Sequence, residues 1–212
     1  MQINTHAMLK HVSSLFEAIV DDLRLKGYSI QTDAIDQQTA LSLYEEISSK
    51  PVEQLMPAGV GRDRQHVIDK SIRSDHIEWI DASTPIGNIW LNWTEALRVD
   101  INRTLFLGLD EFESHYAYYP KGAFYQRHKD AFVGESNRIL SLVAYLNPNW
   151  RPNDGGELVL YRQEDDCKGV TVQPQFGTLV LFLSEEFPHE VLPALQDRYS
   201  IAGWFRQKPK SN

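Results

Sequence analysis

The stretch GTLVLFLSEEFPHEVLPALQDRYSIAGWFR, residues 177–206, contains three short segments rich in β-branched and aromatic residues. Short segments of this composition, bounded by turn-forming residues, are typical of β-strands. Five more such segments lie between residues 113 and 174, separated by turn material such as PKG (120–122) and NPNWRPNDGG (147–156). Eight strands at this spacing predict a two-sheet β sandwich or barrel in the C-terminal half of the chain.

The N-terminal half has the apolar spacing of helices instead. Residues 8–25 place apolar side chains at helical intervals, and residues 36–49 begin with a candidate N-cap, Asp36. We expect helices over these two ranges and over 86–103, with a short strand at 27–31. The first helix should bury Leu9, Val12, Leu15, Phe16, Ile19, Val20 and Leu23, and the second should bury Leu41, Tyr44 and Ile47. The architecture is therefore helices first and a two-sheet β core second.

Composition excludes several classes of protein. With 42% hydrophobic and 24% charged residues, the 212-residue chain has the make-up of an ordinary soluble globular domain. No apolar run of about 18 residues occurs, so we expect no membrane span, and the N-terminus shows no export signal. The net charge of −8 argues against binding to nucleic acids or anionic membranes. A single cysteine, Cys167, rules out an internal disulfide framework and favours a reducing, cytoplasmic location.

A histidine and an aspartate two residues apart, His128 and Asp130, lie in the stretch FYQRHKDAF (124–132). Because strand side chains alternate between faces, residues two apart on a strand point the same way. His76 and Glu78 have the same spacing, so the pair alone is not specific. A later histidine, His189, completes two histidines and one carboxylate, the set that holds non-haem Fe(II) with open coordination positions.

Arg198 follows His189 by nine positions. If a 2-oxo acid chelates the metal, its far carboxylate needs an anchor, and arginine offers a planar, permanently charged fork. A zinc site remains possible on ligand types alone, but no hydrolytic base or fourth-ligand pattern accompanies it. No serine stands in a G-x-S-x-G context, so a nucleophilic triad is set aside.

These residues resemble a known family. The segments YYPKGAFYQRHKD, NRILSLVAYLN, GGELVLY, GTLVLFLSEEFPHEV and RYSIAGWF are similar to those of 2-oxoglutarate- and Fe(II)-dependent oxygenases of the prolyl 4-hydroxylase superfamily, in particular bacterial relatives of the hypoxia-sensing prolyl hydroxylases. The resemblance covers about residues 110–206. It implies an α+β fold: a double-stranded β-helix, or jelly roll, with N-terminal helices packed on one sheet. We expect a single domain over 1–212, with helical support and a substrate loop in 1–110 and the catalytic core in 111–206.

The resemblance also implies roles for individual residues. The expected metal ligands are His128, Asp130 and His189, and the expected 2-oxoglutarate pocket is walled by apolar strand residues. The residues expected near 2-oxoglutarate are Arg198, Tyr145 and Tyr119, with Leu140, Leu142 and Val191 as walls. Near the substrate mouth we expect Arg138 and Trp204.

The segment 57–81 is irregular, bears glycines and carries charges of both signs, as disordered connections and functional lids do. Within it, IRSDHIEWI (72–80) resembles the segment beside the mobile substrate loop of the family. By this resemblance Arg73 and Asp75 would order the closed loop, and His76 and Glu78 would lie on a strand next to it.

The implied activity is hydroxylation of a prolyl residue at C4 in a protein, with Fe(II), 2-oxoglutarate and O2 and with ascorbate as a further candidate. Because Asp130 is present, hydroxylation is favoured over halogenation. A translation component such as an elongation factor is a candidate substrate, and the sequence does not indicate an oligomeric state. Two alternatives stay open: an oxygenase acting on a small molecule or free amino acid, and a jelly-roll sensor that binds metal and 2-oxoglutarate without turnover.

Overall fold

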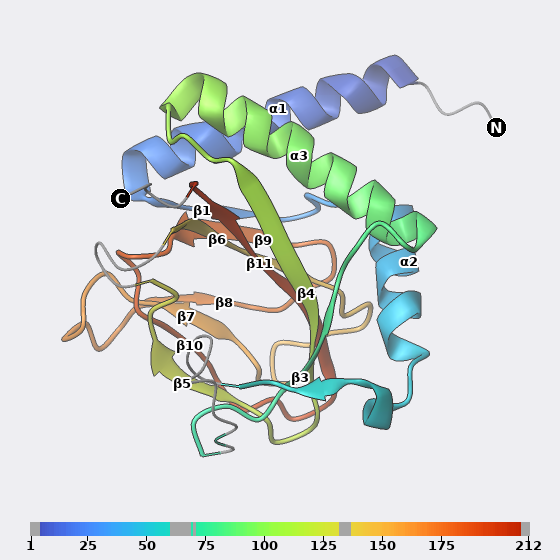
Figure 1. Ribbon diagram of the computed structural model, residues 1–212. Helices are drawn as coiled ribbons and strands as arrows, with labels where there is room; N and C mark the ends of the chain where they lie inside the picture. Colours follow the sequence, from blue (N-terminus) through green and yellow to red (C-terminus); the bar gives the residue numbers. More distant parts are fainter. Residues whose placement is uncertain (1–4, 60–68, 70, 132–136, 209–212) are drawn as a thin grey trace.

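The computed structural model describes residues 5–59, 69, 71–131 and 137–208, with side chains from residue 12 onward (Figure 1). The helices fall where the sequence predicts them. They are α1 (Thr5–Lys26), α2 (Gln37–Ser48) and α3 (Pro85–Leu105), with a single 3-10 turn, η1 (Val52–Gln54).

All eight strands predicted after residue 113 are present, and so is the short strand after α1. The strands are β1 (Tyr28–Gln31), β2 (Met56–Pro57), β3 (His76–Trp79), β4 (Glu111–Tyr119), β5 (Tyr125–His128), β6 (Arg138–Tyr145), β7 (Leu158–Leu160), β8 (Val170–Val172), β9 (Leu179–Leu183), β10 (His189–Val191) and β11 (Arg198–Arg206).

Within the described residues the strands form two antiparallel sheets. The larger has the order β1-β9-β6-β11-β4-β3-β2 and the smaller the order β5-β10-β7-β8. The three helices pack on one face of the larger sheet, and the smaller sheet lies against its other face (Figure 1). This is the predicted α+β arrangement, a jelly-roll sandwich with helices on one side.

Local capping explains where the helices start. The Asp36 carboxylate accepts a hydrogen bond from Thr39 N at 3.0 Å, and the Thr84 hydroxyl accepts one from Gly87 N at 3.0 Å. On α2 the buried stripe is Ala40, Leu43 and Ile47, whereas Leu41 is 36% exposed. The expectation that Leu41 is buried was wrong, because the stripe begins one residue earlier, at Ala40.

The larger sheet has two cores, one on each face. Leu140 and Leu142 of β6 face the helices, whereas Tyr145 faces the smaller sheet and packs in one cluster with Val191. The expectation that Leu140 and Leu142 wall the site was therefore wrong, because side chains of a strand alternate with a period of two. Val191 lies on the expected side.

The chain just before β3 joins the two sheets. Gln126 N donates to Ile72 O at 2.8 Å and Ser74 N to Phe124 O at 3.2 Å, so residues 72–74 run beside the edge strand β5. Residues 76–79 then pair with β4 in the larger sheet. The predicted loop thus ends in an ordered bridge between the sheets, while its residues 60–68 and 70 lie outside the described part.

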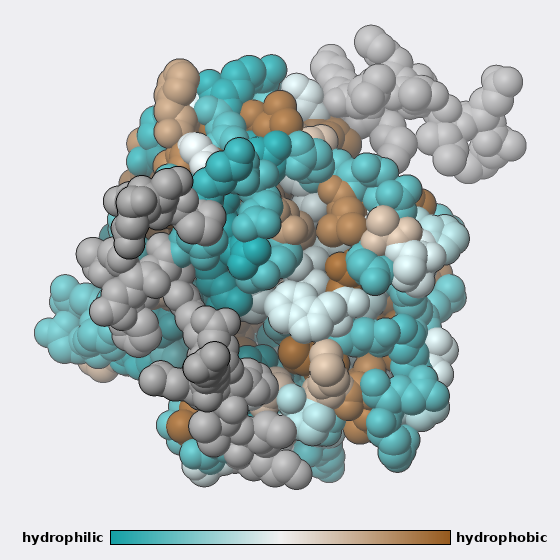
Figure 2. Space-filling model, in the orientation of Figure 1, coloured by the Kyte–Doolittle hydropathy of each residue, from teal (hydrophilic) through white to brown (hydrophobic). Residues whose placement is uncertain are grey.

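No helix within the described ranges carries an apolar stretch long enough to cross a membrane. On the face shown in Figure 2 most residues are hydrophilic, and hydrophobic residues form separate patches between them.

Candidate active site

His128, Asp130 and His189 converge between the sheets. His128 ends β5 and His189 begins β10, and the two are directly opposed in the antiparallel pair. Asp130 Oδ1 lies 3.6 Å from His128 Nε2, and Asp130 Oδ2 lies 3.6 Å from His189 Nε2. Donor atoms of all three residues fall within 4.8 Å of one another. Asp130 lies in a bend, two residues beyond the end of β5. The position of its carboxylate is therefore set by this bend and not by the alternation of strand side chains on which the prediction was based.

Both imidazoles are oriented by backbone carbonyls. His128 Nδ1 lies 2.8 Å from Gln126 O, and His189 Nδ1 lies 3.0 Å from Phe187 O. Since a carbonyl only accepts, each Nδ1 carries a hydrogen, and each Nε2 is left on the side of Asp130. This is the arrangement that fixes the tautomer of metal-binding histidines.

The protonation states also suit a metal. Burial, and after it the nearby His128, lower the pKa of His189 to about 4, so the ring is neutral at neutral pH. Burial would raise the pKa of Asp130, but His189, His128 and a hydrogen bond from Ser141 outweigh it and hold that pKa well below its ordinary value. Neutral imidazole and ionised carboxylate are the forms that bind a divalent ion.

Arg198 begins β11 and is 1% exposed. Its Nε donates to Gly156 O at 2.9 Å and its Nη1 to Ser200 Oγ at 3.1 Å, so the recorded hydrogen-bond partners are neutral. Gly156 has φ +66°, and a Cβ there would lie 2.9 Å from Arg198 Cδ. The NDGG turn therefore needs glycine at this position to hold the arginine.

Two tyrosines lie beside this guanidinium. Its carbon is 4.8 Å from the ring centroid of Tyr119 and 5.2 Å from that of Tyr145. The Tyr145 hydroxyl is buried and makes no hydrogen bond with the described residues. Burial raises the pKa of Tyr145 to about 12, with the Arg198 charge opposing, and burial likewise raises the pKa of Tyr119. A buried cation beside an unsatisfied hydroxyl fits a ligand carboxylate.

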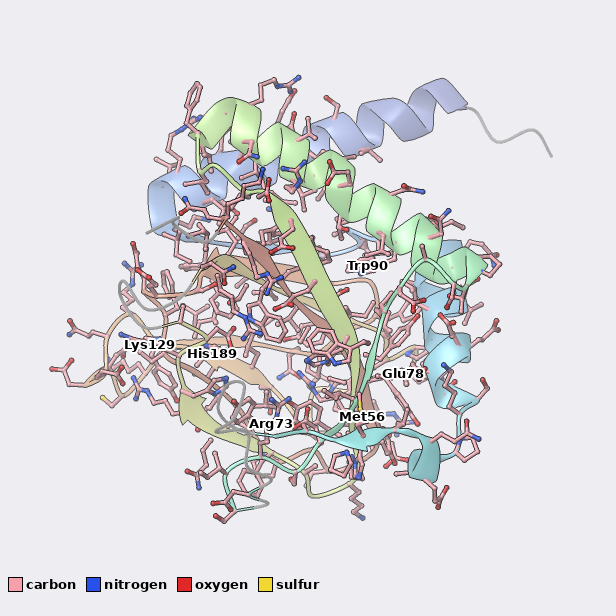
Figure 3. The ribbon with its side chains drawn as sticks, viewed as in Figure 1. Met56, Arg73, Glu78, Trp90, Lys129 and His189 are labelled. Carbon is pink, nitrogen blue, oxygen red and sulfur yellow. The ribbon has the colours of Figure 1, made fainter. Side chains whose placement is uncertain are left out.

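Phe182 links the surroundings of Arg198 to the histidine cluster. Phe182 packs in one cluster with Tyr145 and Tyr119, and its ring centroid lies 4.7 Å from that of His189. In Figure 3 His189 lies toward the smaller sheet, whereas Trp90 lies under α3 on the other side of the larger sheet. The structure thus brings the six expected metal and 2-oxoglutarate residues together in one interior region.

Arg138 and Trp204 lie further along the same inner face. The Arg138 guanidinium carbon is 3.6 Å from the Trp204 ring, and its Nη2 lies 3.1 Å from Glu113 Oε1. The Trp204 indole N–H is buried without a hydrogen-bond partner in the described chain. Trp204 and Arg198 stand six residues apart on β11, so this pair is separated from the arginine pocket along the strand.

Arg73 and Asp75 lie beside the cluster, with Tyr125 between Arg73 and His128. Asp75 is buried and receives hydrogen bonds from Arg73 Nε at 2.7 Å and Nη2 at 2.6 Å. The Arg73 guanidinium carbon lies 4.5 Å from the Tyr125 ring centroid, and the Tyr125 ring stacks on His128 at 3.6 Å. The pair therefore supports β5 rather than contacting the cluster directly.

His76 and Glu78, which have the same spacing as His128 and Asp130, do not join the cluster. They lie on β3 opposite Tyr118 and Tyr116, which face the helices, and Glu78 pairs with Lys50 at 2.5 Å. The prediction that they lie on a strand is confirmed.

Sequence reasoning missed three residues around the cluster: Tyr125, Ser141 and Ser184. Ser141 Oγ donates to Asp130 Oδ2 at 2.6 Å and lies 2.9 Å from Ser184 Oγ. Ser141 could have been predicted from the sequence. It is a polar residue in the apolar segment ILSLVAY, and it lies four residues before Tyr145, so the two side chains are on the same face of the strand.

Comparisons with known proteins give the family. The profile of the 2OG-Fe(II) oxygenase superfamily matches residues 114–206. Egl nine homolog 1 of Mus musculus is 27% identical, over 89% of this chain and 49% of that protein. The hypoxia-inducible factor prolyl hydroxylase of Caenorhabditis elegans is 27% identical, over 95% of this chain and 30% of its own length. The chain thus spans about half, or less, of these curated relatives.

Two solved structures match along nearly their whole length. A prolyl-4-hydroxylase of Pseudomonas putida is 41% identical with a TM-score of 0.81, covering 92% of this chain and 100% of that one. A Trichoplax adhaerens prolyl hydroxylase, in complex with a peptide fragment of the hypoxia-inducible factor oxygen degradation domain, is 28% identical with a TM-score of 0.81 and covers 98% and 95%. The chain therefore belongs to the 2OG-Fe(II) oxygenase superfamily, as a prolyl hydroxylase-like member.

Proposed function

We propose that this chain hydroxylates a prolyl residue of a protein at C4, consuming 2-oxoglutarate and O2 and releasing succinate and CO2. The observation that carries the proposal is that the cluster of His128, Asp130 and His189 and the buried pair Arg198 and Tyr145 pack on either side of Phe182. A 2-oxo acid needs both parts, a metal for one end and an anchor for the far carboxylate. The 41% identity to a prolyl-4-hydroxylase supports the choice of substrate residue.

Each residue has a distinct task in this proposal. His128, Asp130 and His189 hold Fe(II) through two neutral imidazoles and one carboxylate. Bound iron, 2-oxoglutarate and O2 supply the oxidation that converts a substrate C–H to C–OH. Arg198 donates to the far carboxylate of 2-oxoglutarate, Tyr145 donates its unsatisfied hydroxyl to the same group, and Tyr119 lines that pocket.

The outer residues bind substrate. Arg138 and Trp204 form the wall nearer the mouth, where the stacked guanidinium is held by Glu113. Arg73 and Asp75 hold residues 71–75 against β5 and so set the base of the loop that precedes them. Apolar inner-face residues exclude water from the space between the sheets.

The substrate we propose is a polypeptide, and a translation component such as an elongation factor is our candidate. The peptide complex of the Trichoplax adhaerens relative supports a polypeptide over a free amino acid. We further propose that residues 1–212 act as one domain, with 111–206 as its catalytic core, in a cytoplasmic location that suits the exposed Cys167 thiol. Ascorbate is a candidate for keeping the iron reduced.

The test begins with anaerobic binding of Fe(II) and 2-oxoglutarate, followed by their weak visible charge-transfer band. We expect the band in the wild type, its loss in His189→Ala, and its return in Arg198→Ala only at much higher 2-oxoglutarate. The matched control is His76→Ala, because His76 has the same spacing to an acidic residue but faces the helices. A wild type without the band, with iron loading confirmed, would rule the proposal out.

Turnover then separates the alternatives. A purified elongation factor and proline-containing peptides are incubated with the enzyme, and hydroxyproline is sought by mass spectrometry while succinate is measured. A +16 Da proline with matching succinate supports the proposal. Succinate with small molecules alone would identify a small-molecule oxygenase, and tight binding without O2 consumption would identify a sensor.

A further inference from the structure

Ser141 touches the carboxylate of the candidate metal site from the larger sheet. It lies in the middle of β6, is 1% exposed and donates to Asp130 Oδ2 at 2.6 Å. The histidines come from the other sheet, on β5 and β10. Ser141 therefore links the metal-binding carboxylate to the opposite wall of the sandwich.

Asp130 is placed differently from the two histidines. Each imidazole is held by a carbonyl two residues earlier in its own chain segment. Asp130 stands in a bend beyond the end of β5, where no strand pairing sets the direction of its side chain. The Ser141 hydroxyl supplies a fixed direction, because β6 is paired on both sides, with β11 and with β9.

The direction of the hydrogens follows from counting donors. Ser141 Oγ is the donor to Asp130 Oδ2, and a hydroxyl has a single hydrogen, so that hydrogen points at Oδ2. The 2.9 Å contact with Ser184 Oγ must then be a donation from Ser184 to Ser141. Ser184 is fully buried in the turn after β9, five residues before His189. A one-way relay thus runs from Ser184 through Ser141 to Asp130.

We infer that Ser141, backed by Ser184, is a positioning residue that orients Asp130 for metal binding. The inference rests on the proposed function, since it assigns Asp130 to the metal. Outer hydrogen bonds of this kind usually change metal affinity by about 10–100-fold when they are removed. A buried serine with a purely structural role would change stability instead.

The experiment measures the affinity of metal-free protein for Mn(II) by calorimetry, without substrate or turnover. We expect Ser141→Ala to bind about 10–100-fold more weakly, Ser141→Thr to recover most of the affinity by restoring the hydroxyl, and Ser184→Ala to lose less than Ser141→Ala. The matched control is Ser114→Ala, which removes a buried hydroxyl on β4 of the same sheet that accepts from Trp90 Nε1 on the helix side. Its metal affinity should equal that of the wild type.

The outcomes distinguish the role of Ser141 from the proposed function of the chain. Wild-type affinity in Ser141→Ala, or an equal loss in Ser114→Ala, would overturn the role of Ser141 and leave the proposed function standing. Absence of Mn(II) binding in the wild type would instead overturn the proposed function. If Ser141→Ala fails to fold, Ser184→Ala, one step removed from the carboxylate, decides the question by the same measurement.

Discussion

Arg198 is a permanent positive charge in the protein interior. It donates hydrogen bonds to Gly156 O and Ser200 Oγ, which are both neutral groups. Burying an ion without an opposite charge costs several kcal/mol, even after relaxation. The two hydrogen bonds have a charged donor and return about 1.5–3 kcal/mol each, so they offset only part of this cost. The ligand-free protein therefore carries a cost that a bound carboxylate would relieve.

Arg198→Met should consequently stabilise the ligand-free protein while removing 2-oxoglutarate binding. We expect a gain in unfolding free energy of up to about 2 kcal/mol, because the two lost charge-assisted hydrogen bonds cancel much of the ion penalty. Urea unfolding and 2-oxoglutarate titration of the Mn(II)-loaded protein measure the two effects. Arg206→Met, at the partly buried end of the same strand, should not stabilise the protein and should leave 2-oxoglutarate binding unchanged, because Arg206 already pairs with Glu111 and Glu113. If Arg198→Met is less stable than the wild type, contacts within the ligand-free protein already offset the cost of burying the Arg198 charge.

His115 should make stability depend on pH. It is 2% exposed on β4, and burial, together with the Arg73 charge, lowers its pKa to about 4 from 6.5. Arg138 also lowers this pKa, whereas Asp75 and a hydrogen bond to Tyr116 O raise it. Because the folded pKa is depressed, the unfolded chain binds more protons below pH 6.5, and stability falls as the pH drops from 6.5 toward 4.

Between pH 6.5 and pH 5 this single histidine should account for a loss of about 2 kcal/mol, from 1.36 kcal/mol per pH unit. His115→Gln cannot titrate and should lose about that much less than the wild type in urea unfolding at the two pH values, with metal removed. An unchanged pH slope in His115→Gln would mean that His115 is charged in the fold. His189, buried with the same lowered pKa, should keep part of the slope in both proteins.

At the scale of elements, the predictable parts were those with a local signal. The Asp36 cap, the NDGG turn and the alternation of each segment located helices and strands correctly. Contacts between segments that are far apart in the sequence have no local sequence signal. The pairing of residues 72–74 with β5 is an example, because no sequence pattern predicts it. For the same reason, spacing found His128 and Asp130 but not the bend that carries Asp130, nor Ser141 on another strand.

The bridge beside β5 depends on Arg73 and Asp75. The Asp75 side chain is fully buried and that of Arg73 is 13% exposed, so each charge relies on the other. Arg73→Met should cost about 3–5 kcal/mol of unfolding free energy, because it leaves a buried carboxylate without its cation. The double variant Arg73→Met/Asp75→Leu should recover most of that loss, as measured by urea unfolding.

An exposed ion pair provides the comparison. Arg24 and Asp21 on α1 are 51% and 65% exposed, so Arg24→Met should cost less than about 1 kcal/mol. If Arg73→Met costs no more than Arg24→Met, or if the double variant is as unstable as the single one, the buried pair does not hold the bridge in the way described.

At the scale of the whole molecule, the candidate site joins the two sheets. His128 and His189 come from the smaller sheet, whereas Arg198 and Tyr145 come from the larger. A ligand held at both ends would act as a further cross-link between two layers that also meet through side-chain packing and through the bridge of residues 72–74. Ligand binding should therefore be visible in the unfolding of the entire protein, since anything that binds only the folded state stabilises it by mass action.

Mn(II) and 2-oxoglutarate are added together, each at about 100 times its dissociation constant. The 2-oxoglutarate that binds to the Mn(II)-loaded protein should then raise the unfolding free energy by about 2.7 kcal/mol. For a chain of this length, that corresponds to a rise in Tm of roughly 5–10 °C in scanning calorimetry. Arg198→Ala should keep the increment from Mn(II) and lose that from 2-oxoglutarate, whereas His189→Ala should lose both, and EDTA should reverse the effect in the wild type. If His189→Ala keeps the 2-oxoglutarate increment, the co-substrate binds without the metal, and the two sheets do not contribute to one site.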